Sequence, residues 1–125
     1  MPTAESKAYH TDKVVLIYTT FPSPEQAEAM AAKLLAAEMI ACANIVRGMV
    51  AIYRWQGALN RDDETVMILK TQSRLIEAVI AMVRAGHPYD NPAIVAFEAT
   101  GGSAPFLDWV MSETAAASAS SAKQQ

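Results

Sequence analysis

Hydrophobic and polar residues follow two different periods along this chain, and the periods predict the order of its elements. Helical spacing, with apolar side chains every three or four positions, occurs over residues 24–38 and in a segment that ends at Gly86. Mostly apolar and β-branched runs, typical of strands, occur over residues 14–20, 40–55 and 93–99, and over residues 59–71 a polar stretch gives way to such a run. We therefore predict the order β-α-β-β-α-β, followed by a short helix at about residues 104–112.

Turn and capping residues separate these elements. Ser23, Pro24 and Gln26 are typical of a helix start with a capping box, in which side chains satisfy free backbone N–H groups. Gly48 interrupts the longest apolar run and predicts a bend or bulge there. Gln56-Gly57 marks a turn, so the two longest strands form a hairpin that projects beyond a small domain.

The predicted order corresponds to an α+β ferredoxin-like sandwich, in which two helices cover one face of a four-stranded sheet. If the other face met water, its positions would be mostly polar. Instead, Leu16 and Tyr18 alternate with Val15 and Ile17, so both faces of this strand are apolar. We expect other copies of the chain to cover the second face.

Length and composition agree with one domain that shares part of its core. The chain has 125 residues, of which 52% are hydrophobic, but 24 are alanine and add little buried surface. We expect a disordered leader over residues 1–12, the folded domain over residues 13–114, and a disordered low-complexity tail over residues 115–125.

Charge and hydropathy argue against several classes of function. The net charge is −3 and no basic tract occurs, so we expect no nucleic-acid partner. No apolar run approaches the roughly 18 residues that span a bilayer, so we expect no membrane association. The single cysteine, Cys42, agrees with a reducing compartment. We therefore expect a cytoplasmic protein.

The densest group of polar side chains is the segment 87–92, with the sequence HPYDNP. Its two prolines stiffen the backbone around His87 and Asp90. In one interpretation the segment is a rigid connector in which these two side chains cap backbone groups; in another they bind a ligand. We do not expect an enzyme, because no nucleophile or substrate-orienting motif accompanies this acid/base pair.

Cys42 is a second candidate ligand. A lone thiol in an apolar strand is often a small buried hydrophobic residue. Alternatively, its thiolate pairs with the imidazole of His87, a combination that suits copper or zinc. Two ligands do not close a site, and Asp90, Glu64, water or a neighbouring subunit would have to complete it. Such a site would be open, weak or shared between subunits.

Two further groups lie on the predicted hairpin. Tyr53 and Trp55 flank an arginine next to the turn, and large rings in that position are typical of interface anchors. Lys70 ends an apolar run, where its ammonium either reaches an anion in a cleft or extends into solvent.

Five segments, in order, resemble the CutA divalent-cation tolerance proteins: residues 41–45 (ACANI), 52–57 (IYRWQG), 67–71 (MILKT), 87–92 (HPYDNP) and 106–109 (FLDW). The resemblance covers about residues 14–112. It implies a ferredoxin-like domain that forms a tight homotrimer, similar in architecture to the PII signalling proteins, with links to copper binding and heavy-metal tolerance.

The resemblance also implies site residues. Cys42 and His87 match positions discussed as metal ligands in that family, and Asp90 stands where relatives usually carry glutamate. An intersubunit cleft in the family is lined by positions that match Tyr53, Trp55, Glu64, Lys70 and Tyr89.

The prediction is therefore a trimeric cytoplasmic protein that binds copper (Cu²⁺) or another divalent transition metal, without an organic cofactor, and takes part in tolerance of heavy metals. The alternative is a PII-like signalling module that holds a small ligand in the intersubunit cleft and meets a protein partner of unknown identity.

Overall fold

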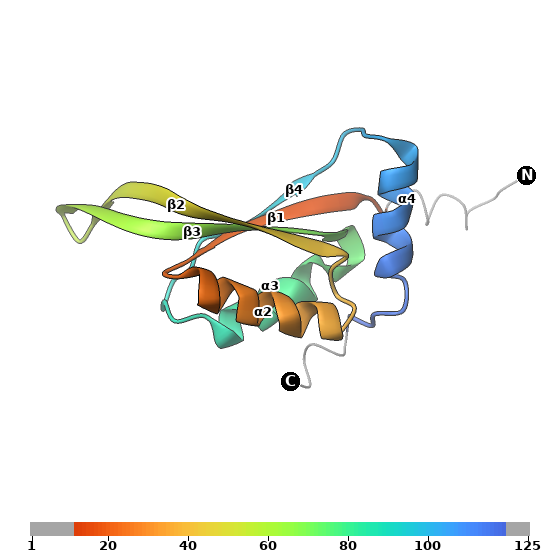
Figure 1. Ribbon diagram of the computed structural model, residues 1–125, viewed down its shortest axis with the longest axis horizontal. Coiled ribbons are helices and arrows are strands. Elements are labelled where there is room, and N and C mark those ends of the chain that lie inside the picture. The colour runs from red at the N-terminus through yellow and green to blue at the C-terminus, as the bar shows by residue number, and fades with distance from the viewer. Residues whose placement is uncertain (1–11, 120–125) are drawn as a thin grey trace, which may run out of the picture.

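The computed structural model describes residues 12–119, which form one four-stranded sheet and three α-helices (Figure 1). The elements follow in the order β1 (Val14–Phe21), α2 (Pro24–Ala36), β2 (Cys42–Trp55), β3 (Ala58–Gln72), a 3₁₀ turn η1 (Ser73–Leu75), α3 (Ile76–Gly86), β4 (Ile94–Glu98) and α4 (Ala104–Glu113). The predicted order of elements is confirmed. The predicted leader falls almost entirely outside the described residues, of which it shares only residue 12.

The sheet has the strand order β2-β3-β1-β4, and every neighbouring pair is antiparallel. β2 and β3 form the long hairpin that the sequence predicts. Its turn residues Gln56 and Gly57 have φ values of 51° and 82°. Positive φ at both central residues matches the twist of the flanking strands, and glycine adopts it without steric cost.

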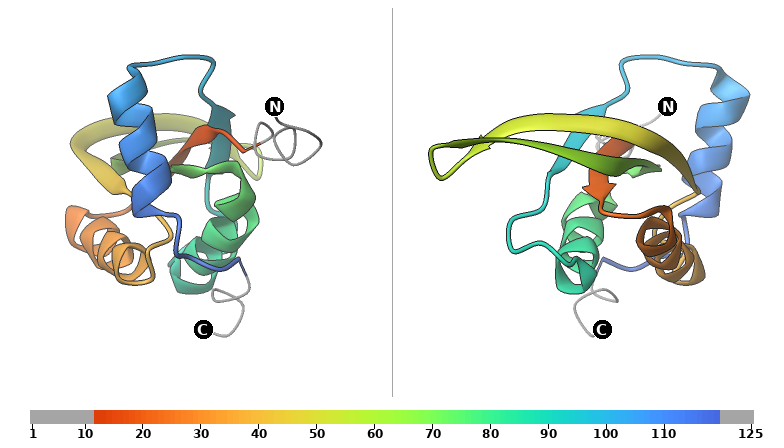
Figure 2. Two further views of the ribbon diagram at one scale, coloured as in Figure 1. Left: turned by 90° about the vertical axis from the view of Figure 1, so that its right-hand side faces the viewer. Right: turned by 60° about the vertical axis from the view of Figure 1, so that its left-hand side comes forward.

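Helices α2 and α3 cover one face of the sheet, and Figure 2 shows both of them on the same side. Ser23 is the N-cap of α2: its Oγ accepts a hydrogen bond from the Gln26 backbone N–H at 3.3 Å and donates one to Gln26 Oε1 at 3.0 Å. The N-cap prediction is therefore confirmed. The core between the helices and the sheet consists of buried side chains, and those without any exposed surface include Ile17, Leu34, Met67, Leu69 and Val79.

Helix α4 packs across one end of the opposite face, where Val14, Ala41 and Val110 form a second small core. Figure 2 shows α4 upright at the end of the sheet, with its first turns on the side away from α2 and α3. No helix among residues 12–119 is long and apolar enough to cross a membrane.

The chain after α4 is part of the domain. Arg74 donates hydrogen bonds to the carbonyl oxygens of Thr114, Ala115 and Ala117 at 3.1, 3.0 and 2.8 Å. Ala117 is only 7% exposed and joins the main core. The predicted boundary at residue 114 is therefore too early, and a disordered tail is wrong for residues 115–119, because Arg74 binds this backbone and Ala117 packs into the core. Residues 120–125 lie outside the described residues.

The rest of the second face, which we call the open face, carries no helix within the described chain. Strand register places Leu16 in line with Phe97, and Tyr18 in line with Val95, while Ile68 lies beside Tyr18. Phe97 is 56% exposed and Val95 is 47% exposed. The open face is therefore apolar, as the alternation of the strand residues predicts.

The β2–β3 hairpin extends beyond the rest of the molecule (Figure 1). The register of β2 shifts between Val46, which pairs with Val66, and Met49, which pairs with Glu64. Gly48 lies in this shift with a φ of 78°. The bulge expected at Gly48 is confirmed, and a bulge bends its strand and increases the local twist.

Candidate functional site

His87 is held by two backbone groups at the start of the connector between α3 and β4. Its Nε2 lies 2.7 Å from the carbonyl oxygen of Thr20, and its Nδ1 accepts a hydrogen bond from the Tyr89 backbone N–H at 3.1 Å. Nδ1 is therefore unprotonated, and Nε2 carries the proton that it donates to Thr20. The ring stacks on Phe21 with centroids 4.4 Å apart. For His87, the geometry matches the capping interpretation.

Tyr89 reaches from the same connector to the hairpin. Its hydroxyl donates to Glu64 Oε2 at 2.8 Å, and its ring lies against the His87 ring with centroids 5.0 Å apart. Burial, the hydrogen bond to Glu64 and the charge of that carboxylate together raise the pKa of Tyr89 to about 12, and burial is the largest of these causes. The connector and the hairpin, distant in sequence, thus meet at this pair.

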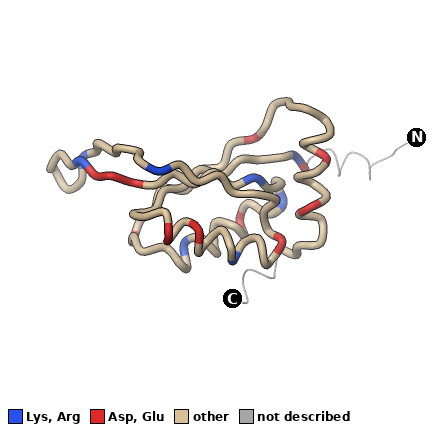
Figure 3. The backbone as a smooth tube through the Cα atoms, viewed as in Figure 1, with Lys and Arg blue, Asp and Glu red and all other residues tan. Residues whose placement is uncertain are grey.

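A second phenol binds a carboxylate within the hairpin itself. The Tyr53 hydroxyl donates to Asp62, and this hydrogen bond is the main reason why the pKa of Tyr53 is raised. Asp62, Asp63 and Glu64 form an unbroken acidic stretch on the β3 arm, visible as the red segment of the hairpin in Figure 3. The β3 arm therefore carries three adjacent carboxylates, next to Arg61.

Cys42 and His87 are not brought together within one chain. Cys42 opens β2 opposite Lys70, whereas Thr20, the partner of His87, lies opposite Val66. Four positions along β3 correspond to about 13 Å. Asp90 is exposed in the connector. Within residues 12–119, no group of three or more His, Cys, Asp or Glu residues is arranged to hold a metal ion. The described residues of a single chain therefore do not fit a metal centre.

Lys70 is fixed on the open face. Its Nζ lies 2.5 Å from Asn44 Oδ1 and 5.5 Å from the centre of the Phe106 ring on α4. Sequence reasoning did not select Asn44 or Phe106 as site residues. Asn44 could have been found, because it follows Cys42 by two positions and so shares its face of the strand. Phe106 had no such signal, because the position of α4 depends on tertiary packing.

The five residues expected around a cleft separate into three places. Glu64 and Tyr89 are hydrogen bonded, and Tyr53 binds the neighbouring Asp62. Trp55, in contrast, pairs with Ala58 near the hairpin turn, twelve positions from Lys70 along β3. That separation is about 40 Å in an extended strand. One chain therefore cannot assemble all five residues around one cleft.

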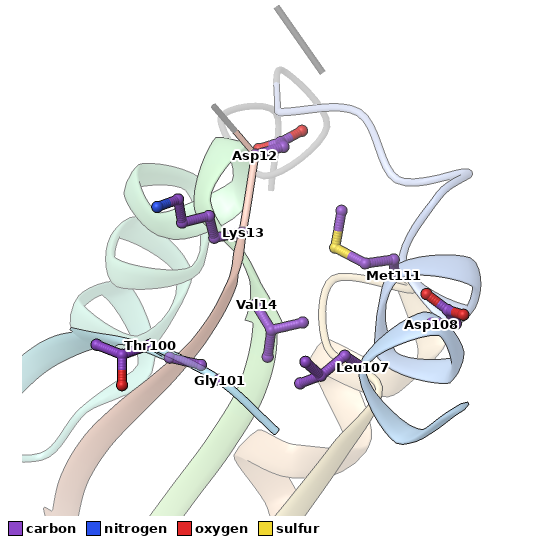
Figure 4. Close-up of a pocket in the computed structure, with 9 residues that line it drawn as sticks. Asp12, Lys13, Val14, Thr100, Gly101, Leu107, Asp108 and Met111 are labelled. Carbon is purple, nitrogen blue, oxygen red and sulfur yellow. The ribbon is translucent and has the colours of Figure 1, made fainter. Parts of the chain in front are cut away.

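A hollow of about 350 Å³ lies elsewhere, between the start of β1, the β4–α4 connection and α4 (Figure 4). Val14, Leu107 and Met111 lie toward one another in it, whereas the side chains of Lys13 and Thr100 extend away from them. No residue of the predicted site lines this hollow. Because its polar groups do not converge, we assign it no ligand.

Fold and site together define the class of protein. It is a small α+β domain whose notable polar groups lie on a projecting hairpin, on the connector that contacts it and on an uncovered apolar sheet face. The chain belongs to the family described as CutA1 divalent ion tolerance protein, whose sequence model matches residues 15–113. The resemblance inferred from the five sequence segments is thereby confirmed.

Individual relatives agree with this assignment. The chain is 40% identical to the divalent-cation tolerance protein CutA of Thermus thermophilus, over 82% of this chain and 98% of that protein. It is 35% identical to the chloroplastic protein CutA of Arabidopsis thaliana, over 80% of this chain but only 55% of that protein. The chain thus spans about half the length of the plant relative.

Solved structures are also similar. CutA1 from Ehrlichia chaffeensis matches with a TM-score of 0.79 and 35% identity, covering 82% of this chain and 96% of that one. CutA1 from Pyrococcus horikoshii matches with a TM-score of 0.75 and 40% identity, covering 80% and 97% of the two chains. The α+β fold with its antiparallel sheet is therefore the fold of this family.

Proposed function

We propose that this protein acts in tolerance of heavy metals as a cytoplasmic homotrimer of ferredoxin-like domains, and that it binds copper or another divalent transition metal where copies meet. Membership of the divalent-cation tolerance family supports the general role. The observation that carries the proposal is the open face, which is apolar and exposed in a single chain.

The open face favours self-association. Leu16, Val95 and Phe97 are all exposed there, and exposed apolar surface costs about 25 cal/mol for each Å² left in water. Contiguous patches of this kind mark interaction sites. A closed, symmetric assembly of identical chains would cover the same face on every copy and leave no patch exposed.

Association would also bring together residues that one chain holds apart. Cys42 starts β2 on the open face and is only partly buried, so a second copy packed there can approach its thiol. Trp55, 53% exposed near the hairpin turn, is free to contact a neighbour. A shared site is the form of metal binding that we propose, since the described part of one chain contains no group of three potential ligands.

A second candidate function rests on Lys70. Its ammonium is held by Asn44 and Phe106, and none of the ion pairs within residues 12–119 involves it. A fixed cation without a carboxylate partner suits a small anion. The corresponding function is a PII-like module that binds an anionic metabolite in a cleft between subunits and signals to a protein partner.

Sedimentation equilibrium at micromolar concentration tests the assembly. We expect a mass three times that of the 13.5 kDa chain. Leu16→Asp should lower the mass to that of the monomer, because it places a charge on the open face. Leu35→Asp is the matched control: Leu35 is similarly exposed but lies on α2, and this variant should remain trimeric. A monomeric unsubstituted chain would refute the proposal.

Titration calorimetry with Cu²⁺ and Zn²⁺ tests the ligand. We expect saturable binding that Cys42→Ser weakens at least tenfold, with His10→Ala as the control that leaves binding unchanged. A thermal-shift series with inorganic phosphate separates the two candidates, because a ligand that binds only the folded state raises its melting temperature. Stabilisation by phosphate that Lys70→Met abolishes, without any by metal, would favour the anion-binding function and overturn the metal-binding one.

A further inference from the structure

The support that the sheet gives to the hairpin ends at a defined point. β1 pairs with β3 as far as Phe21 and Thr65. The next residue of β3 is Glu64, which faces Met49, the first paired residue after the bulge at Gly48. From there to the turn, the two arms pair only with each other. A bulge next to the end of sheet support is a place where a hairpin can change its angle to the body.

One side chain from the body binds the hairpin at this point. The Tyr89 hydroxyl donates to Glu64 Oε2 at 2.8 Å. Within the described chain, the other polar side-chain contacts of residues 49–64 stay inside that segment: Tyr53 binds Asp62, Arg61 pairs with Asp63, and Asn60 binds the carbonyl oxygen of Ala58. The Tyr89–Glu64 bond therefore acts as a strut from the connector to the first unsupported residue.

Tyr89, the residue at the body end of this strut, is itself held in place by His87. The Tyr89 backbone N–H binds His87 Nδ1 at 3.1 Å, and His87 Nε2 binds the Thr20 carbonyl oxygen at 2.7 Å. The His87 ring also stacks on Phe21. Thr20 and Phe21 are the last two residues of β1, so the base of the strut is the strand end that lies beside Glu64 on β3.

We propose that Tyr89 is a positioning residue that sets the angle of the β2–β3 hairpin through Glu64, and that His87 holds Tyr89 in place by binding the end of β1. The device orients the surface that carries Tyr53, Trp55 and the acidic stretch. It rests on contacts within one chain and requires neither a bound metal nor a particular ligand. His87 serves here as a tie between backbone groups, with both ring nitrogens in use.

Distances between two spin labels measure the angle directly. Labels are placed at Arg61→Cys on the hairpin and Glu28→Cys on the exposed side of α2, in a chain that also carries Cys42→Ala. Labelled chains are mixed with an excess of unlabelled chain, so that each assembly carries at most one labelled copy. Pulsed electron–electron double resonance then gives the distribution of distances between the label on the hairpin and the label on α2.

We expect Tyr89→Phe to broaden this distribution at least twofold, because it removes only the hydroxyl that binds Glu64. Glu64→Ala should broaden it equally, and the double variant should add nothing, since both remove the same bond. Glu64→Gln should restore a narrow distribution, because its amide oxygen still accepts a hydrogen bond.

Tyr53→Phe is the matched control. It removes the same chemical group from a bond inside the hairpin, so the distribution should stay narrow. An unchanged distribution in Tyr89→Phe, or an equal broadening in Tyr53→Phe, would overturn the proposal. Circular dichroism of each variant establishes that it is folded, and Glu64→Ala, at a partly exposed position, provides a second variant if Tyr89→Phe is unstable. Metal titration is a separate measurement, so failure of either proposal leaves the other to be judged by itself.

Discussion

The Nε2 atom of His87 lies 2.7 Å from the carbonyl oxygen of Thr20, so a side chain of the connector between α3 and β4 binds the backbone at the end of β1. His87→Ala leaves this carbonyl and the Tyr89 N–H without their partner. Loss of one partner in such a bond costs about 1–3 kcal/mol, and we expect the free energy of unfolding in urea to fall by that amount. His87→Gln, which keeps an amide donor, should lose less. Unchanged stability in His87→Ala together with lost copper binding would instead identify His87 as a ligand.

Arg74 should be important for the order of the chain after α4. Its guanidinium binds three carbonyl oxygens of residues 114–117, and the planar fork of arginine suits this better than the single ammonium of lysine. We expect Arg74→Lys to destabilise the protein by about 1–3 kcal/mol and to speed amide hydrogen exchange in residues 115–119. Arg84→Lys, on the exposed side of α3, is the control. Equal exchange in both variants would contradict this role.

Stability should decrease at high pH because of Tyr89. The pKa of its phenol is raised to about 12 in the folded protein, whereas a phenol in the unfolded chain titrates near 10. Between these values the unfolded chain loses the proton that the folded chain keeps. The stabilisation is therefore complete below about pH 10 and is lost as the pH rises toward 12.

Tyr89→Phe should remove this part of the pH dependence. Urea unfolding of both proteins over this pH range is the measurement, with tyrosinate absorbance as a direct check on the phenol. A folded protein in which every phenol titrates near pH 10 would contradict the prediction.

Gly48 should tolerate substitution less well than Gly101. Gly48 has a φ of 78°, a conformation that costs an L-residue about 1–2 kcal/mol, although space for a Cβ atom is open there. Gly101 has equally open space, and its φ lies outside the positive region. Gly48→Ala should therefore lower the melting temperature, while Gly101→Ala should leave it unchanged or raise it slightly. Equal effects at both positions would show that backbone strain at the bulge is unimportant.

Much of the fold could be predicted because its signals are local. The capping group at Ser23, the turn at Gln56-Gly57 and the bulge at Gly48 each depend on a few neighbouring residues, and all three are found in the structure. The end of the domain could not be predicted in this way. Ala117 looks like part of a low-complexity tail, and only the distant Arg74 makes it a core residue.

The candidate site, like the fold, could be predicted from the sequence only in part. Sequence analysis selected His87 as a metal ligand and grouped Glu64 and Tyr89 at one cleft, but it did not predict the hydrogen bonds that these residues make within one chain. The bond from Tyr89 to Glu64 joins residues 25 positions apart, and that from His87 to Thr20 joins residues 67 apart. No local pattern reports such pairs, because they depend on where the connector crosses the end of β1.

The sequence by itself therefore determined the family, the order of strands and helices, and the apolar character of both sheet faces, since each follows from periodicity or from short motifs. Only the tertiary structure decided that Cys42 and His87 lie apart, that Lys70 is held by Asn44 and Phe106, and that Tyr89 supports the hairpin. These features depend on strand register and on the packing of α4, which bring distant residues together through the whole fold.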